Sequence, residues 1–258
     1  MKISIITATY NREKLLSRLY ESLCEQTCKD FEWIIIDDGS VDNTEKLIKS
    51  YIYEELLDIT YIKKSNGGKH TAMNKGTEIA KYEFSFFVDS DDYLPENSIE
   101  TICDKIALIE TYPNYANICG ICGDKQDIQK NAIKSGLKNE FLGNYLDFRY
   151  ELKIKGDKAE VFKTDILRKF KFPEFEGEKF CPEALIWNRI ALYYDMLFIK
   201  ETIYFCEYQD EGLTSKIYEI RKKSPKATLL YYKELFQNRR VPLYYRARAL
   251  ANYFRFKR

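Results

Sequence analysis

The first half of the sequence alternates short apolar runs with longer segments that carry leucine and isoleucine at helical spacing. Apolar runs rich in β-branched and aromatic residues indicate strands that are buried on both faces. Strands that alternate with helices of about ten to fifteen residues predict βαβ units and a largely parallel sheet. The expected strands are Lys2–Thr7, Glu32–Asp37, Ile59–Ile62, Phe84–Val88 and Ala116–Cys122.

This pattern divides the chain into three parts. With 258 residues, of which 45% are hydrophobic, the chain can bury a large core. The alternation is regular over residues 1–123 and loosens over residues 124–220, where we expect a short strand near Glu160–Phe162 and a helix over about 182–193. Residues 221–258 are helical in pattern, aromatic and basic. We therefore expect one α/β domain in two halves, with a mostly parallel central sheet flanked by helices and a helical C-terminal extension.

The expected strand Phe84–Val88 is followed at once by three carboxylates, those of Asp89, Asp91 and Asp92. Ligands of open α/β sheets bind at this end of the strands. Like charges so close together repel, and the arrangement costs free energy unless a cation neutralises it. Hard oxygen ligands suit Mg²⁺ or Mn²⁺. The alternative interpretation is an acidic turn in which Asp92 caps a helix that begins near Pro95.

Three further loops after expected strands carry residues suited to a nucleotide. Tyr10 offers a flat ring on which a base can stack, an interaction that stabilises by ~1–3 kcal/mol. Asp38 has a carboxylate able to accept the N–H of a uracil ring. Lys69 follows two glycines at the expected start of a helix, where backbone N–H groups and a cation favour phosphate or ribose. Four such loops at one edge of a parallel sheet predict a nucleotide site there.

Two common nucleotide-binding motifs are missing from the sequence. A P-loop needs a glycine five residues before Gly68 and Ser or Thr after Lys69, but Lys63 and His70 occupy these positions. No Gly-x-Gly-x-x-Gly fingerprint follows the first expected strand. His70 is the only histidine, which excludes a histidine metal cluster and a Ser-His-Asp triad. This side chain is expected to contact either its own helix N-terminus or the ligand.

The loops also carry a family resemblance. The segments Ile5–Arg12, Ile34–Asp42 and Val88–Asp92 resemble the signatures of family 2 glycosyltransferases, which have the GT-A fold. Asn66–Asn74 resembles a subgroup of bacterial members, and the likeness is to enzymes of surface-polysaccharide synthesis. The match is continuous over about residues 1–110 and specific in order and spacing. It implies a Rossmann-like GT-A sheet.

The resemblance implies roles for the residues that match the motifs. The backbone of Ala8 and the ring of Tyr10 would hold the nucleotide base, and Asp38 would recognise uracil. Lys69 would lie near the ribose or the diphosphate. These residues, together with Asp89, form the implied binding site for the nucleotide sugar.

The resemblance also implies a metal site and a division of labour between the two halves. Asp89 and Asp91 would form the Asp-x-Asp pair that serves the ribose and a divalent metal, Mn²⁺ or Mg²⁺. Residues 1–123 would be the nucleotide-sugar-binding half. Residues 124–220 would be the acceptor-binding half of the same GT-A domain, and residues 221–258 a basic aromatic helical tail.

A catalytic base is implied by a second, shorter match. Family members commonly show an acidic pair four residues before an aromatic residue, and the second acid acts as the base. Here Trp187 lies four residues after Glu183, so Glu183 aligns with the base, while Pro182 replaces the first acid. Glu178 and Glu176 are the other candidates. Glu183 could instead be an acid of the first helical turn that the helix dipole favours.

The implied reaction moves a sugar from a UDP-sugar to a hydroxyl of a glycan or lipid-linked acceptor, with metal dependence and inversion. A metal would stabilise the leaving diphosphate, and the base would accept the hydroxyl proton on the opposite face of the sugar. One alternative is a nucleotidyltransferase, which usually has a Gly-rich loop after its first strand. Another is an inactive nucleotide-sugar-binding protein.

The formal net charge of +1 conceals an uneven distribution. Residues 221–258 hold twelve Lys and Arg and one acid, Glu234, so this segment carries +11 and the remainder −10. Pro242 splits the tail into two expected helices, and basic, aromatic-rich amphipathic helices bind membrane interfaces. The tail therefore either contacts an anionic membrane surface or packs on the acidic body. A nucleic-acid partner is not expected, because the body would repel it and no recognition motif is present.

The cysteines and the hydropathy pattern bear on location. The seven cysteines are odd in number and lack the spacing of a disulfide framework, so we expect reduced thiols. Cys119 and Cys122 lie in an apolar strand and are expected in the core. No signal peptide precedes the first expected strand, and no apolar run approaches the ~18 residues that span a membrane. We expect a cytoplasmic protein, with the inner face of the plasma membrane as the place where the tail would bind.

Overall fold

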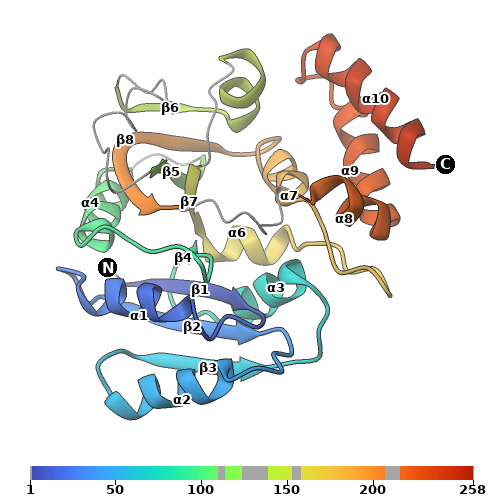
Figure 1. Ribbon diagram of the computed structural model, residues 1–258. Coiled ribbons are helices and arrows are strands. Elements are labelled where there is room, and N and C mark those ends of the chain that lie inside the picture. The colour runs from blue at the N-terminus through green and yellow to red at the C-terminus, as the bar shows by residue number, and fades with distance from the viewer. Residues whose placement is uncertain (1, 110–113, 124–138, 153–157, 207–215, 258) are drawn as a thin grey trace.

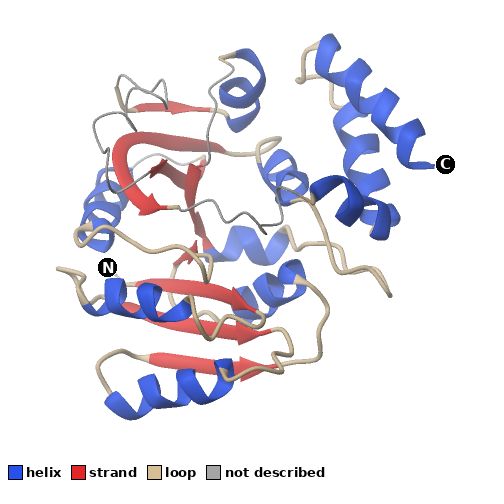
Figure 2. Cartoon of the chain, viewed as in Figure 1, coloured by secondary structure: helices blue, strands red, loops and turns tan. Residues whose placement is uncertain are grey.

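The structure is a computed structural model and describes residues 2–109, 114–123, 139–152, 158–206 and 216–257. It contains an eight-stranded sheet in the order β3-β2-β1-β4-β7-β5-β8-β6 (Figures 1 and 2). The strands are β1 (Ile3–Thr9), β2 (Phe31–Asp37), β3 (Ile59–Lys63), β4 (Phe84–Phe87), β5 (Tyr115–Gly123), β6 (Phe141–Gly143), β7 (Lys158–Lys163) and β8 (Asp195–Phe205). The helices are α1 (Leu16–Cys24), α2 (Thr44–Glu54), α3 (Lys69–Ile79), α4 (Ser98–Ile109), α6 (Thr164–Lys169), α7 (Glu183–Ile190), α8 (Ile217–Lys223), α9 (Pro225–Gln237) and α10 (Leu243–Lys257), and Asp147–Glu151 form a short π-helical turn.

The strands β3, β2, β1 and β4 are parallel, as the alternating sequence pattern predicts. In their register Thr9 pairs with Asp37, and Asp37 with Lys63, so β1, β2 and β3 end level with one another. Strand β1 has β2 on one side and β4 on the other, so the strand order reverses at β1. Open α/β sheets bind ligands at such a point. The loops that carry the candidate residues therefore meet at one edge.

The other half of the sheet is mixed. Strand β7 runs antiparallel to both β4 and β5, while β5 and β8 are parallel and β6 is antiparallel to β8. An isolated pair of backbone hydrogen bonds joins Tyr93, just after the acidic loop, to Phe205 at the end of β8. This contact attaches the acidic loop to the second half of the domain.

Helices cover both faces of the parallel half because its strands are apolar on both faces. Ile3 and Ile5 of β1 pack in a core with α1, α2 and α4, while Ile6 packs on the opposite face with Ala72 of α3. All three isoleucines are essentially inaccessible to solvent, and full burial of such a side chain stabilises by about 1.5–3 kcal/mol. Gly76 of α3 allows this helix to approach β1, since a Cβ there would lie 2.3 Å from a methyl of Ile6.

The C-terminal helices pack on the body of the protein. Figure 1 shows α8, α9 and α10 grouped beside α7, and the break at Pro242 separates α9 from α10 as expected. Leu235, Val241 and Ala249 of this region are buried in a core cluster that includes Trp187 of α7. The inner side of the tail thus packs on the body, as one of the two interpretations of the sequence predicted. None of the described helices is both long enough and apolar enough to cross a membrane.

The cysteines are all free thiols, in agreement with the expectation of a reduced protein. Cys119 is buried in β5, and burial raises its pKa well above the ordinary value. Cys122, on the same strand, is half-buried and packs against the core.

Candidate active site

The loops after β1 and β2 are joined by hydrogen bonds at the sheet edge. Asn11 has a left-handed backbone (φ 53°), and its N–H donates to the hydroxyl of Ser40 at 2.9 Å. Its side-chain oxygen accepts the N–H of Val41, also at 2.9 Å. Asparagine tolerates this conformation better than most residues, which explains its place here. Ala8, in the last part of β1, and the 47% exposed Tyr10 precede this junction.

Asp38 organises the loop that leads into α3. Its carboxylate is 3% exposed and accepts the backbone N–H groups of Gly67 at 2.9 Å and Gly68 at 2.7 Å. Lys64 forms an ion pair with the same carboxylate at 2.7 Å. A buried charge is tolerated only when it is paired and hydrogen-bonded, and here both conditions are met. The glycine loop is therefore held in place by the carboxylate after β2.

Lys69, the first residue of α3, connects two carboxylates. Its ammonium lies 2.7 Å from Asp89 after β4 and 2.8 Å from Glu183 at the start of α7. Burial by itself lowers the pKa of Lys69, but Asp89 and Glu183 outweigh it and raise that pKa above its ordinary value. Lys69 is therefore a permanent cation between the acidic loop and the candidate base.

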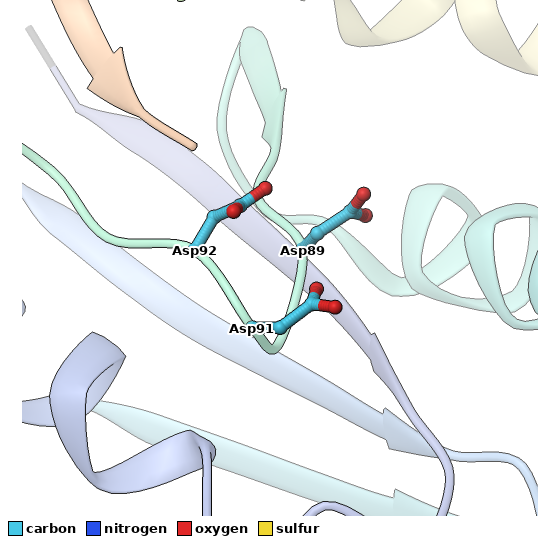
Figure 3. A group of neighbouring side chains, drawn as sticks. All are labelled: Asp89, Asp91 and Asp92. Atoms are coloured by element: carbon cyan, nitrogen blue, oxygen red, sulfur yellow. The ribbon is translucent and has the colours of Figure 1, made fainter. Parts of the chain in front are cut away.

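The acidic loop brings its three carboxylates together. The ligand oxygens of Asp89, Asp91 and Asp92 lie within 4.8 Å of one another, and Figure 3 shows all three side chains extending from one turn after β4. Helix α4 begins at Ser98, well after Asp92, so the helix-capping alternative for Asp92 is wrong. Asp92 instead accepts the hydroxyl of Tyr204 at 2.8 Å.

Cations and a tyrosine support this loop from outside it. Arg12 lies 3.4 Å from the carboxylate of Asp91, and Arg18 donates to the Asp91 backbone carbonyl. The Tyr204 hydroxyl, which donates to Asp92, accepts the N–H of Asp89 at 2.9 Å. Desolvation, with the nearby carboxylates, raises the pKa of Tyr204 well above its ordinary value, so the phenol stays protonated and can donate.

The loop fits a divalent cation by the chemistry of its donors. Carboxylate oxygens are the hard ligands that Mg²⁺ and Mn²⁺ prefer, and one metal usually takes one or two carboxylates together with substrate phosphates. Asp89 and Asp91 are partly exposed, whereas Asp92 is buried and accepts a hydrogen bond from the Tyr204 hydroxyl. The accessible pair is thus the Asp-x-Asp pair that the sequence singles out.

Glu183 is the first residue of α7, and its side chain is 42% exposed. The other two candidate bases have different surroundings. Glu178 is 8% exposed and accepts the N–H groups of Lys226 and Ala227 at the start of α9. Glu176 is exposed at the surface. Of the three acids, Glu183 is the one in contact with Lys69 and hence with the acidic loop.

His70 follows Lys69 in the first turn of α3 and is 3% exposed. Its Nδ1 atom is buried without a hydrogen-bond partner among the described residues. Desolvation by burial lowers the pKa of this imidazole, so it is neutral near pH 7.

Sequence reasoning missed several residues that complete the site. Tyr204 belongs to β8 and is separated from Asp92 by 112 positions, so no local pattern points to it. Asn74 of α3 exchanges hydrogen bonds with the backbone of Phe172, again from a distant segment. Lys64 precedes the glycine loop by a few residues, but its partner Asp38 lies 26 positions earlier, so the sequence does not show that the two meet.

Fold and site together define a GT-A type transferase, with the candidate loops at the edge of a mostly parallel sheet and an Asp-x-Asp pair after β4. The sequence matches the profile described as glycosyl transferase family 2 over residues 4–169. The chain belongs to this family. Glycosyltransferase GlyG of Streptococcus pneumoniae is 27% identical over 213 residues, which are 78% of this chain and 69% of that protein.

A second curated relative is the GalNAc(5)-diNAcBac-PP-undecaprenol beta-1,3-glucosyltransferase of Campylobacter jejuni. It is 30% identical over 193 residues, which cover 72% of this chain and 58% of that protein. The chain thus spans only part of the length of these relatives. The family match and the bacterial relatives confirm the resemblance stated from the motifs.

Solved structures confirm the fold. S. aureus TarS in complex with UDP-GlcNAc has a TM-score of 0.72 at 22% identity, with 99% of this chain and 72% of that chain covered. Mannosyltransferase PcManGT from Pyrobaculum calidifontis, in complex with GDP-Man and Mn²⁺, has a TM-score of 0.65 at 16% identity, with 98% and 69% covered. The GT-A expectation is therefore correct.

We expect stability to depend on pH through His70. Its folded pKa lies below the ordinary value of 6.5, so the unfolded chain binds this proton more readily and the folded state loses stability as pH falls below about 6.5. The loss is at most ~1.4 kcal/mol per pH unit. Urea unfolding at about pH 7.5 and about pH 5.5 should show a larger drop for wild type than for His70→Gln. Equal drops would show that the imidazole titrates alike in both states.

Proposed function

We propose that the protein transfers a sugar from a UDP-sugar to a hydroxyl of a glycan or lipid-linked acceptor, in the synthesis of a bacterial surface polysaccharide. The observation that carries this proposal is the bridge from Asp89 through Lys69 to Glu183, which gathers donor-side carboxylates and a candidate base around one point. The UDP-GlcNAc complex of TarS supports the donor class. The name of the Campylobacter relative, which contains PP-undecaprenol, supports a lipid-linked acceptor.

The donor's base would lie against the loop after β1. The ring of Tyr10 is about half exposed and available for stacking, and the backbone of Ala8 would flank the base. Asp38 would shape the site through Gly67 and Gly68 and offer a remaining lone pair of its carboxylate to the uracil N–H. Lys69 would face the ribose or diphosphate.

Asp89 and Asp91 would hold Mn²⁺ or Mg²⁺, with Asp89 also contacting the ribose. When bound, the metal would act as a Lewis acid that stabilises the leaving diphosphate. Arg12 and Lys69, which pair with these carboxylates here, would add positive charge for the same phosphates. The Mn²⁺ complex of the mannosyltransferase supports a divalent metal in a protein of this fold.

Glu183 would act as general base. A carboxylate at this position can accept the proton of the acceptor hydroxyl as the oxygen attacks the anomeric carbon. The ammonium of Lys69, 2.8 Å away, would fix the direction of the carboxylate. Direct attack needs no covalent intermediate and inverts the anomeric configuration. An inactive sugar-nucleotide-binding protein would bind UDP but release none from a UDP-sugar.

The tail would place the enzyme on an anionic membrane at the inner face of the plasma membrane. Its inner side is packed, but Leu243, Tyr244 and Phe254 of α10 are 75%, 69% and 54% exposed. Arg248 and Arg255 are exposed on the same helix. An outward face that combines apolar and basic side chains suits a membrane interface, where each Lys or Arg adds ~1 kcal/mol.

Replacing Asp91 by Asn tests the metal site and the function together. We expect UDP release from UDP-sugars to fall by about 10²–10³-fold, because one charged ligand is lost. The free energy of unfolding should not decrease, since the change relieves repulsion between carboxylates. Release is measured with and without Mn²⁺ and EDTA. Asp165→Asn, an exposed acid on α6, is the control and should behave as wild type. Full activity of Asp91→Asn, or of wild type in excess EDTA, would disprove the metal role.

Replacing Glu183 by Gln tests the base. The shape is kept but the proton acceptor is lost, so turnover should fall by ~10²–10⁴ while UDP affinity changes little. Calorimetric UDP titration and a UDP-release assay give the two values. Glu176→Gln, an exposed acid nearby in the sequence, should retain wild-type turnover. A joint collapse of UDP affinity and turnover in Glu183→Gln would show a structural role instead.

Co-sedimentation with vesicles tests the tail. Wild type should sediment with vesicles that contain anionic lipid and less so at high salt, because exposed charges are screened. A variant with Leu243, Tyr244 and Phe254 all changed to Ser should remain in solution. Its matched control carries Ser at three exposed apolar positions of the other half, Val41, Tyr53 and Leu56. Failure of wild type to bind at any salt concentration would eliminate the membrane proposal.

A further inference from the structure

The segment that leads into Glu183, residues 172–182, is fixed from the side of α3. The Asn74 side chain donates to the Phe172 carbonyl and accepts the Phe172 N–H, both at 2.9 Å. Lys179 packs its backbone directly on Gly68, where a Cβ would lie 2.0 Å from the Lys179 carbonyl oxygen. The segment therefore lies on the loop that Asp38 organises and from which Lys69 follows.

The same segment is fixed from the opposite side by the tail. Both carboxylate oxygens of the buried Glu178 are in use, one accepting the Lys226 N–H at 2.6 Å and the other the Ala227 N–H at 2.9 Å. Both N–H groups belong to the first turn of α9, which begins at Pro225, where backbone N–H groups have no partner within the helix. A carboxylate at a helix N-terminus is also favoured by the helix dipole. Glu178 thus attaches the segment before the base to α9.

A second contact joins α9 to the other end of α7. Arg189, in the last turn of α7, donates two hydrogen bonds to the carboxylate of Glu234 at 2.6 and 2.8 Å. Paired contacts of this kind fix direction as well as distance. Helix α7 is therefore attached to α9 at its C-terminal end directly and at its N-terminal end through Glu178.

We propose that α9 is a positioning element for the catalytic base, and that Glu178 is the positioning residue through which it acts on Glu183. This inference rests on the proposed role of Glu183. Four residues separate Glu178 from Glu183, so a shift of the anchored end changes the reach of the Glu183 carboxylate toward Lys69 and the acceptor. The residues proposed to hold the donor come from β1, β2, α3 and the acidic loop, so donor binding is expected to survive the loss of this anchor.

The test compares Glu178→Ala and Glu178→Gln with Glu32→Ala in the full chain. Glu32 is also buried and accepts a backbone N–H, that of Lys81, but it lies near the opposite end of the strands from the site. Three quantities are measured. The first is the rate of UDP release, with UDP-N-acetylglucosamine, UDP-glucose and UDP-galactose as substrates. The second is the Kd for UDP, and the third is the midpoint of thermal unfolding.

We expect Glu178→Ala to lower kcat by about 10–100-fold, since a displacement of about 1 Å at a reacting group has this effect. The Kd for UDP should stay within about twofold of wild type, because the donor contacts are not altered. Glu178→Gln keeps one acceptor oxygen and should lie between wild type and Glu178→Ala, and it carries the test if the alanine variant does not fold. Glu32→Ala should lower the unfolding midpoint with kcat unchanged.

A double variant separates positioning from general damage. If Glu178 acts through Glu183, the combination of Glu178→Ala with Glu183→Gln should be no slower than Glu183→Gln alone, because residues that act as a unit are not additive. Multiplied losses, or wild-type kcat in both Glu178 variants, would overturn the proposal. If Glu183→Gln is itself as fast as wild type, the base assignment fails and the positioning role falls with it, so the two failures are distinguishable.

Discussion

The ammonium of Lys69, held between the carboxylates of Asp89 and Glu183, is the contact on which the arrangement of the site depends. Asp89 belongs to the half that contains β1 to β4 and Glu183 to the half that begins after β5, and two carboxylates facing one another would repel without a cation between them. The groups are partly exposed, and such pairs each add only ~0.2–1 kcal/mol to stability. The bridge therefore matters for where the two acids lie, far more than for how stable the protein is.

The backbone around Gly68 makes this bridge possible. Gly68 has φ of +95°, donates its N–H to Asp38 and receives the backbone of Lys179 where any side chain would collide. A single residue without a Cβ thus lets the segment before Glu183 lie on the loop that Asp38 holds, one position before Lys69. The carboxylate of Asp38 holds that loop in place. It can be almost fully buried because these hydrogen bonds and an ion pair offset the cost of burying its charge.

The charge asymmetry between tail and body is resolved partly inside the molecule. Arg240 of the tail lies 3.5 Å from Asp147 of the body, a pair that offsets the asymmetry. The pair of Arg189 with Glu234, the single acid of the tail, runs in the opposite sense and only attaches the tail to the body. Aromatic residues of the tail also pack inward, as with Tyr245 against Tyr150. Part of the aromatic surface that the sequence shows is therefore an internal interface, whereas most of the basic side chains of the tail, on α8 and α9 as well as on α10, stay exposed.

The sequence by itself determined the parallel half of the sheet and the strand-end loops. Apolar runs of strand length are local signals, and the residues that follow them must meet at one edge once the strands are parallel. Asp89, Asp91, Lys69 and Glu183 could be found in this way or by resemblance. Only the tertiary structure decided that Tyr204 supports the acidic loop, that Glu178 caps α9 and that the tail packs on α7. These contacts join residues far apart in the chain, and their partners are set by packing, which no local pattern encodes.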